Sequence, residues 1–197
     1  TNPSDFVLGY IYSKEGNEKS GYWNSSNRSL EITVPVDNDS TLEDGVIQIQ
    51  VKFDEVYNDL GELISIRENS LGRDTTIIIE GDLFINQEEF YNEENALFRA
   101  MVWDKSGNLV ISGVSNSIIH IDTINSVISN IYVKSNNLDT TLAKVGDSLF
   151  INFESNELLD SVSMLVYQNL SNFQNIDLNW ESLYRFQESD IEGFVSF

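Results

Sequence analysis

The sequence predicts an all-β protein made of two β-sandwich domains in tandem, over residues 1–122 and 123–197, the second incomplete at its C-terminus. Short apolar segments alternate with polar residues at a period of two, which is typical of half-buried strands, and no segment shows the helical period. Turn-forming residues separate these segments about every 8 to 12 residues. The pattern then starts again about 120 residues further along the chain, which indicates a repeat.

Two segments of the first domain, residues 30–36 and 46–53, alternate most clearly. We expect Gln48, Gln50 and Lys52 to face solvent. Because Pro35 has no N–H group, it should lie at a strand end or on an unpaired side. The residues expected to face the core are Leu30, Ile32, Val34, Val36, Ile47, Ile49, Val51 and Phe53.

The other strands of the first domain are less regular. They are expected over residues 5–13, 63–66, 75–80, 97–103 and 109–121, the last broken near Gly113. In the strand 97–103, Phe98, Ala100 and Val102 should point inward and leave Arg99 exposed. About seven short strands favour a sandwich of immunoglobulin type, with a β-barrel as the main alternative.

The second domain repeats this order. Residues 130–135, 149–153 and 162–166 correspond to 9–14, 30–34 and 47–51, and residues 193–197 correspond to the start of the strand at Leu97. A sandwich that lacks its last strands leaves backbone N–H and C=O groups of the neighbouring strands unpaired. We therefore expect either a fragment of a longer protein, or completion by a β-strand from a neighbouring molecule.

The charge of the chain limits its partners. It has 11 basic and 32 acidic residues, a formal net charge of -21 and a pI of about 4.1. Such a surface repels phosphate backbones and anionic lipids, so nucleic acid and membrane surfaces are not expected as partners. Membrane insertion is not expected because no apolar run approaches the roughly 20 residues of a membrane span. It suits divalent cations or a saline medium, or serves only solubility. The chain has no cysteine, which excludes disulfides and thiol chemistry.

No residue set indicates catalysis, and we predict that the protein is not an enzyme. His120 is the only histidine, so no triad or histidine metal set can form around it. The neighbouring carboxylates Glu88 and Glu89 belong to an acidic loop, residues 87–95, and are explained by solvation of that loop.

Two short motifs resemble those of bacterial Ig-like domains in long surface proteins and adhesins. The turn at residues 104–108 (DKSGN), followed by Ile121-Asp122-Thr123, resembles the closing strand pair of that family. Residues 143–147 (AKVGD) and 155–157 (SNE) resemble its second-strand region. The family linker usually has a proline after the threonine, whereas here Asn125-Ser126 follow Ile124.

The resemblance implies a tandem extracellular array. Its role would be that of a structural spacer in a cell-surface or virion-surface assembly, such as a stalk, fibre or coat lattice, with neighbouring Ig-like domains of the same or an identical chain as partners. The alternative is a carbohydrate- or receptor-binding adhesin module. An accessory domain of a glycan-processing enzyme is a third class.

Acidic and amide side chains at two places suit Ca²⁺, which binds six to eight oxygens. In an immunoglobulin-type sandwich the loop after the second strand lies beside the last hairpin, so Asp37 and Asp39 should approach Asp104 and Asn108. The alternative is that Asp104 and Asn108 only make turn hydrogen bonds, with Gly107 at positive φ. A second ion would stiffen the interdomain joint through Asp122, Glu154 and Glu157.

Aromatic residues offer a further candidate surface. They either line a glycan platform or pack in the core. The residues concerned are Trp23, Trp103, Trp180, Tyr22, Tyr57, Tyr91 and Tyr184. Asn24, Asn27, Asn38 and Asn169 each begin an Asn-X-Ser sequon, which matters only in a host that glycosylates such sites.

Overall fold

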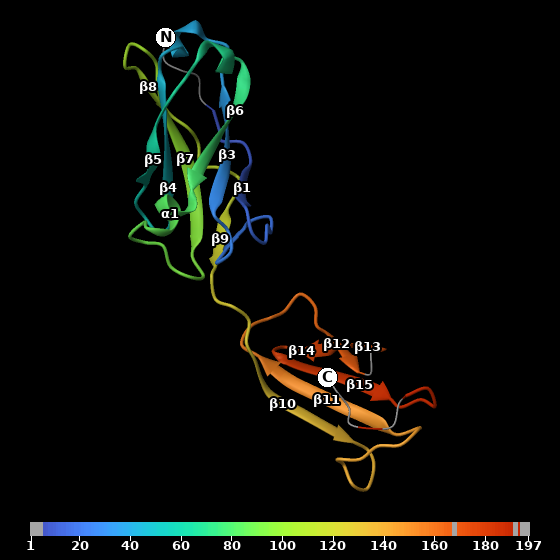
Figure 1. The fold of residues 1–197 in the computed structure, drawn as a ribbon. Coiled ribbons are helices and arrows are strands. Elements are labelled where there is room, and N and C mark those ends of the chain that lie inside the picture. The colour runs from blue at the N-terminus through green and yellow to red at the C-terminus, as the bar shows by residue number, and fades with distance from the viewer. Residues whose placement is uncertain (1–5, 167–168, 191–192, 194–197) are drawn as a thin grey trace. The chain divides into compact units, whose positions relative to one another are not determined.

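The chain forms two compact all-β units, Thr1–Ile124 and Asn125–Phe197. The structure, a computed structural model, describes residues 6–166, 169–190 and 193. Regular structure in these residues is almost all strand, as predicted, and the α-helix α1(Gly81–Ile85) is a single short turn (Figure 1). No helix in this part of the chain has the length and apolar character needed to cross a membrane.

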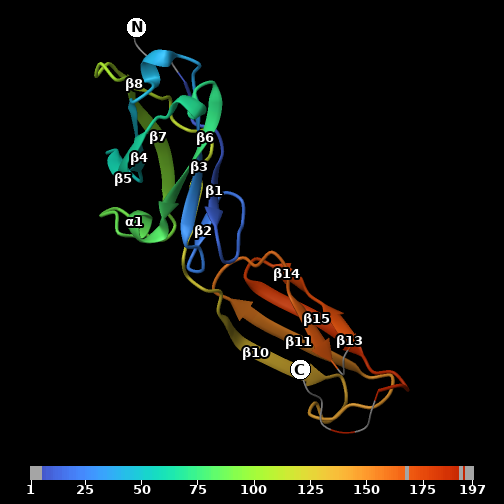
Figure 2. The same ribbon diagram turned by 45° about the horizontal axis from the view of Figure 1, so that its top comes forward.

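The first unit is a sandwich of two sheets. One is β1(Ile11–Lys14), β3(Ser29–Val36) and β6(Arg73–Glu80), all antiparallel. The other runs in the order β2(Tyr22–Asn24), β9(Ile119–Asp122), β7(Asn95–Trp103), β4(Val46–Lys52), β5(Asn58–Ser65), and β8(Leu109–Ile111) also pairs with β7. Figure 2 shows the two layers of this unit from a second side. Two 3-10 turns, η1(Ser40–Leu42) and η2(Glu68–Ser70), lie in the connections.

The core lies between these layers. Every residue predicted to face inward on the strands at 30–36, 46–53 and 97–103 is buried, which confirms the predicted set of core residues on these strands. An aromatic cluster fills one end, with Phe84 of α1 against Trp23, Phe53, Phe90 and Phe98. Gly81 opens this helix with its N–H donating to Arg28 O at 2.6 Å, and a Cβ there would lie 2.5 Å from that oxygen. Only glycine allows the helix to approach so closely.

The outward-facing glutamines of β4 are buried, contrary to the prediction. Gln48 is 5% exposed and Gln50 8%. Gln48 Nε2 donates to the carbonyl oxygens of Ile49 and Gly61, and Gln50 donates to Asp59 and accepts from Arg99. Neighbouring strands supply all of these partners except Ile49, so the alternation within β4 alone does not reveal them.

One further detail differs from the sequence prediction, and two agree with it. β2 lies where no strand was predicted and pairs in parallel with β9. The last strand is interrupted as expected, into β8 and β9, and Gly113 forms an isolated parallel bridge with Val7. Pro35 lies one residue before the end of β3. This agrees with the prediction, because proline has no N–H group to donate to a neighbouring strand.

The second unit has a four-stranded sheet and a hairpin. The sheet order is β10(Ile128–Ser135), β11(Ser148–Ser155), β15(Asn179–Arg185), β14(Gln174–Ile176), and the hairpin is β12(Ser163–Val166) with β13(Asn169–Asn172). Its buried cluster is small, comprising Leu149, Ile151, Val166, Tyr184 and Phe186. The indole N–H of Trp180 donates to Ser155 Oγ at 3.1 Å.

The two units share a strand order. β10, β11 and β15 are antiparallel neighbours in the same sequence as β1, β3 and β6. Residues 194–197, most of the segment that we compared with the strand at Leu97, lie outside the described residues. The completion of the second sandwich therefore stays a prediction.

Candidate functional site

The turn at residues 104–108 is closed by its own polar groups. Asp104 is 4% exposed, and its Oδ1 accepts hydrogen bonds from the N–H groups of Ser106 and Asn108 at 2.9 and 2.8 Å. Its Oδ2 accepts from Asn108 Nδ2 at 2.7 Å. These bonds hold the pKa of Asp104 below its usual value, and the bond from the Asn108 side chain has the largest effect. Gly107 adopts a φ of +84°, as a turn of this kind requires.

The loop after β3 meets this turn. Lys105 N donates to Thr41 O at 3.2 Å, and Asp39 Oδ1 accepts from Thr41 N at 2.8 Å at the start of η1. The bond from Thr41 lowers the pKa of Asp39, and the nearby Asp104 carboxylate opposes that shift. Asp37 is exposed in the same loop. The structure thus brings Asp39, Asp104 and Asn108 to one place.

The oxygen atoms that could bind a metal ion at this place are largely occupied by hydrogen bonds within the protein. Both carboxylate oxygens of Asp104 accept protein hydrogen bonds. Among the residues that the structure describes, no group of three or more His, Asp or Glu side chains has the spacing to hold a metal ion.

The second set of proposed calcium ligands spans both units and stays a prediction. In the first unit Asp122 is partly buried at the end of β9, and its Oδ1 has no hydrogen-bond partner in the described structure. In the second unit Glu154 is exposed on β11 and accepts from Asn130 Nδ2 at 2.5 Å. The backbone oxygen of the partly buried Glu157 accepts from Ser155 Oγ at 2.6 Å.

His120 is partly buried, and its ring contacts neighbouring side chains instead of facing open solvent. Its Nδ1 is 3.2 Å from Asn95 Oδ1, and its Nε2 is 3.8 Å from Glu93 Oε2. The Tyr22 ring contacts it edge-on at 5.5 Å between centroids. These partners orient the ring and hold residues 93–95 beside β9.

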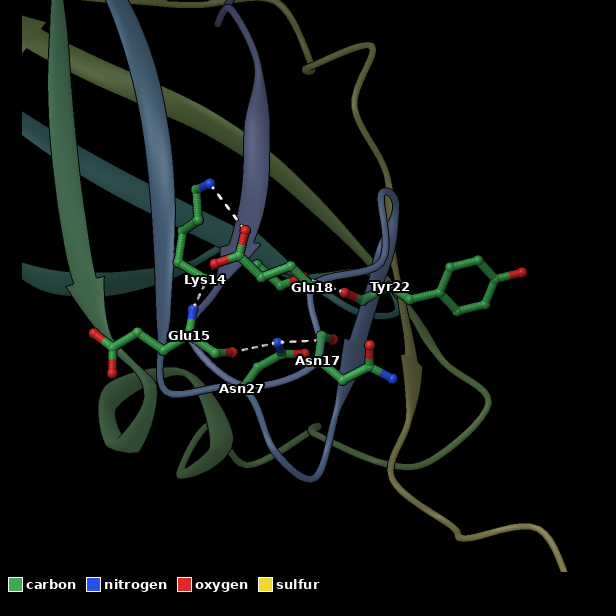
Figure 3. A network of polar contacts seen from close by, with 7 residues as sticks. Lys14, Glu15, Asn17, Glu18, Tyr22 and Asn27 are labelled. Atoms are coloured by element: carbon green, nitrogen blue, oxygen red, sulfur yellow. Dashed lines mark hydrogen bonds and ion pairs between the residues drawn. The ribbon is translucent and has the colours of Figure 1, made fainter.

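The loop between β1 and β2 is a preorganised polar network (Figure 3). Lys14 Nζ lies 3.1 Å from Glu18 Oε2, while Glu18 Oε1 accepts from Glu15 N at 3.0 Å. Asn27 is 3% exposed and donates to Glu15 O at 2.8 Å, and its Oδ1 accepts from Asn24 N at 2.8 Å. Asn27 is therefore a buried structural residue, and its sequon is inaccessible in the folded unit.

Three members of the predicted aromatic platform are core residues. Trp23, Trp180 and Tyr184 are 2, 4 and 8% exposed. Trp103 and Tyr57 are partly buried, and Arg99 lies over the Tyr57 ring at 3.8 Å. Tyr22 and Tyr91 are exposed, at 36 and 63%.

The sequence prediction missed a pair of exposed aromatic residues at the start of the chain. Tyr10 and Tyr12 are 66 and 38% exposed, and their rings are nearly parallel, with centroids 5.8 Å apart and an interplanar angle of 16°. The available signal was their spacing of two residues around the inward-facing Ile11, which puts both rings on one face of a strand.

Comparisons with known proteins leave the family open. No protein-family model and no curated protein matches the chain. A solved structure, the crystal structure of a chicken TCR, is similar over 89% of this chain and 91% of that chain, with 13% sequence identity and a TM-score of 0.34. The sandwich assignment given above comes from the strand pairing and the buried core.

Proposed function

We propose that this chain is a non-catalytic structural repeat of an extracellular surface assembly, such as a stalk, fibre, coat lattice or virion surface. The observation that carries the proposal is the tandem arrangement of two β units, each with its own core and with a shared strand order. Units of this kind extend a chain while each folds around its own core. The high negative charge suits a solvated surface.

The proposed relationship is to the Ig-like repeats of bacterial surface proteins and adhesins. Its support is the turn at residues 104–108, where the aspartate and the asparagine four residues later hold each other through three hydrogen bonds. Such a turn fixes the hairpin of β7 and β8 and directs the chain into β8.

Antibodies against the purified chain test the location and the role together. They should label intact, unpermeabilised cells or particles of the source, with a permeabilised sample as the control for total antigen. Negative-stain micrographs of the concentrated chain should show filaments or a lattice. Labelling that requires permeabilisation contradicts the surface location, and a chain that stays monomeric at high concentration contradicts self-assembly.

A second function, that of a carbohydrate- or receptor-binding adhesin module, is favoured by the exposed Tyr10–Tyr12 pair. A glycan array distinguishes it from a pure spacer. Specific binding that depends on exposed aromatic residues supports an adhesin, whereas a flat array together with assembly in micrographs supports the spacer.

Calcium is part of the proposal as a stiffening ion. With about 1 mM Ca²⁺, a concentration at which extracellular modules bind it, the melting temperature of the first unit should rise relative to EDTA or Mg²⁺. Replacing Asp37 and Asp39 by asparagine should remove the rise at the first site. Replacing Glu154 and Glu157 by glutamine should remove any calcium-dependent loss of interdomain flexibility in scattering. Curves that do not change with calcium contradict both sites.

A further inference from the structure

The outer face of the β1–β3–β6 sheet is the surface with an unexplained feature. On its inner side the strands alternate Ile11, Ile32 and Ile77 into the core. On its outer side β1 and the residue before it present two tyrosines. Exposed aromatic side chains of this size leave a large apolar area in water.

The two rings form one aromatic surface rather than two isolated side chains. They are 5.8 Å apart and inclined by only 16°. The backbone beneath them is fixed by pairing with β3, since Gly9 N donates to Thr33 O at 2.8 Å and Thr33 N donates to Tyr10 O at 2.9 Å. Because tyrosine has few rotatable bonds, holding the rings in this arrangement costs little side-chain entropy.

Polar side chains and one exposed isoleucine border this surface. Glu31 lies opposite Tyr12 in the strand register, and Ile78, 65% exposed, lies beyond it on β6. Thr33 and Thr76 form the next row along the sheet. On the other side Lys14 Nζ lies 5.7 Å from the centre of the Tyr12 ring and is also paired with Glu18. Exposed aromatic faces next to hydrogen-bonding groups suit a ligand that is itself amphipathic.

The negative charge of the chain limits which class of ligand can stack on these tyrosines. Nucleobases stack on aromatic side chains, but their phosphates need a positively charged groove. This chain has a net charge of -21, and Lys14, which lies over the Tyr12 ring, is paired with Glu18. The same charge disfavours sialylated or uronate-containing glycans. A quaternary ammonium group would need rings enclosing it from several sides, whereas these two lie nearly parallel on an open strand.

We propose that Tyr10 and Tyr12 form a stacking site for a neutral oligosaccharide. The C–H face of a sugar ring packs on the tyrosines, while its hydroxyl groups bond to Glu31, Thr33 and the tyrosine hydroxyls. The site is independent of the spacer role proposed above and gives the adhesin function a location.

Titration of the purified chain with individual glycans tests the site. The neutral probes are maltohexaose, cellohexaose, chitohexaose and lacto-N-tetraose, and the charged probes are 3′-sialyllactose and choline. Saturation-transfer NMR detects binding and calorimetry measures it. We expect at least one neutral probe to bind with a Kd of about 1 mM or tighter, and the charged probes to bind more weakly.

The variants Tyr10→Ala and Tyr12→Ala should each weaken that binding by about tenfold or more, in line with the loss of aromatic stacking in other proteins. Tyr10→Phe and Tyr12→Phe should retain most of it because the ring remains. Tyr91→Ala is the matched control, since Tyr91, at 63%, is about as exposed as Tyr10 and lies outside the proposed site. Circular dichroism and an unchanged melting temperature verify that each variant is folded.

Each outcome is decisive for the site. Loss of binding in both alanine variants, with binding retained in Tyr91→Ala, supports it. A neutral glycan that still binds both alanine variants places binding elsewhere and overturns the site while leaving an adhesin function. Preference for choline or sialyllactose overturns the ligand class. If no probe binds, the site is refuted, and the spacer proposal, which has its own test, is unaffected.

Discussion

The aromatic cluster around Phe84 should determine much of the stability of the first unit. Phe84 is fully buried, although its helix is only five residues long. Its ring centroid is 5.0 Å from Trp23, 5.3 Å from Phe90 and 5.7 Å from Phe53. The replacement Phe84→Ala therefore removes the centre of the cluster while leaving the strands unchanged.

The expected cost follows from that environment. Truncation of a buried phenylalanine to alanine destabilises by about 3–5 kcal/mol, and each aromatic pair adds roughly 0.5–1.5 kcal/mol beyond the buried area. We expect a loss of about 4–5 kcal/mol in the free energy of unfolding of the first unit. For a domain of this size that is a drop in melting temperature of roughly 10–20 °C.

Differential scanning calorimetry is the assay, because it separates the transitions of the two units. Only the transition of the first unit should move. Leu83→Ala is the matched control from the same helix, since Leu83 is 45% exposed and should cost less than about 1 kcal/mol. A loss below about 1 kcal/mol for Phe84→Ala, or an equal shift for both variants, would refute the view that α1 closes the core.

Three other replacements test particular contacts. Asn27→Ala removes the hydrogen bonds of a buried side chain to Glu15 O and Asn24 N and should cost about 1–3 kcal/mol in chemical denaturation; an unchanged midpoint contradicts the network. Asp104→Asn should destabilise at pH 7 and should destabilise less at pH 3. The lowered pKa of Asp104 contributes stability above the unfolded-state value of about 3.9, and this is lost as the pH falls through the folded pKa. An equal loss at both pH values contradicts that reasoning. In a double-mutant cycle, Arg99→Ala and Tyr57→Leu should couple by about 0.5–1 kcal/mol because the guanidinium lies over the ring; zero coupling contradicts this.

Local periodicity was sufficient to predict much of the first unit. Ile47, Ile49 and Val51 alternate at the period of a strand, and each is buried as expected. The same rule was wrong for Gln48 and Gln50 because what buries them is on neighbouring strands. A side chain on the outer face of a sheet is exposed only if nothing from the next strand covers it.

Short elements escaped the prediction for a related reason. β2 has three residues and pairs with residues 120–122, about a hundred positions away in the chain, so no local pattern marks it. The helix α1, with five residues, is much shorter than the roughly 11 to 18 residues over which helical periodicity can be recognised. Its position is instead fixed by the close contact of Gly81 with Arg28 O.

The candidate sites likewise divide into those that a local sequence pattern predicts and those that depend on contacts between strands. The turn chemistry of Asp104 and Asn108 is encoded within five residues, and the hydrogen bonds are those considered from the sequence. The burial of Trp23 and Trp180 and the exposure of Tyr10 depend on which face of a strand meets the core, and aromatic residues occur on both faces.

The pairing of β9 has a mechanical consequence. A pulling force applied along the chain from residue 125 enters the first unit through β9, which is flanked by β2 in parallel and β7 in antiparallel register. The bonds to β7 lie across the strand axis and so across the force. A pull directed along the axis of β9 therefore loads these bonds together, in shear, rather than breaking them one at a time.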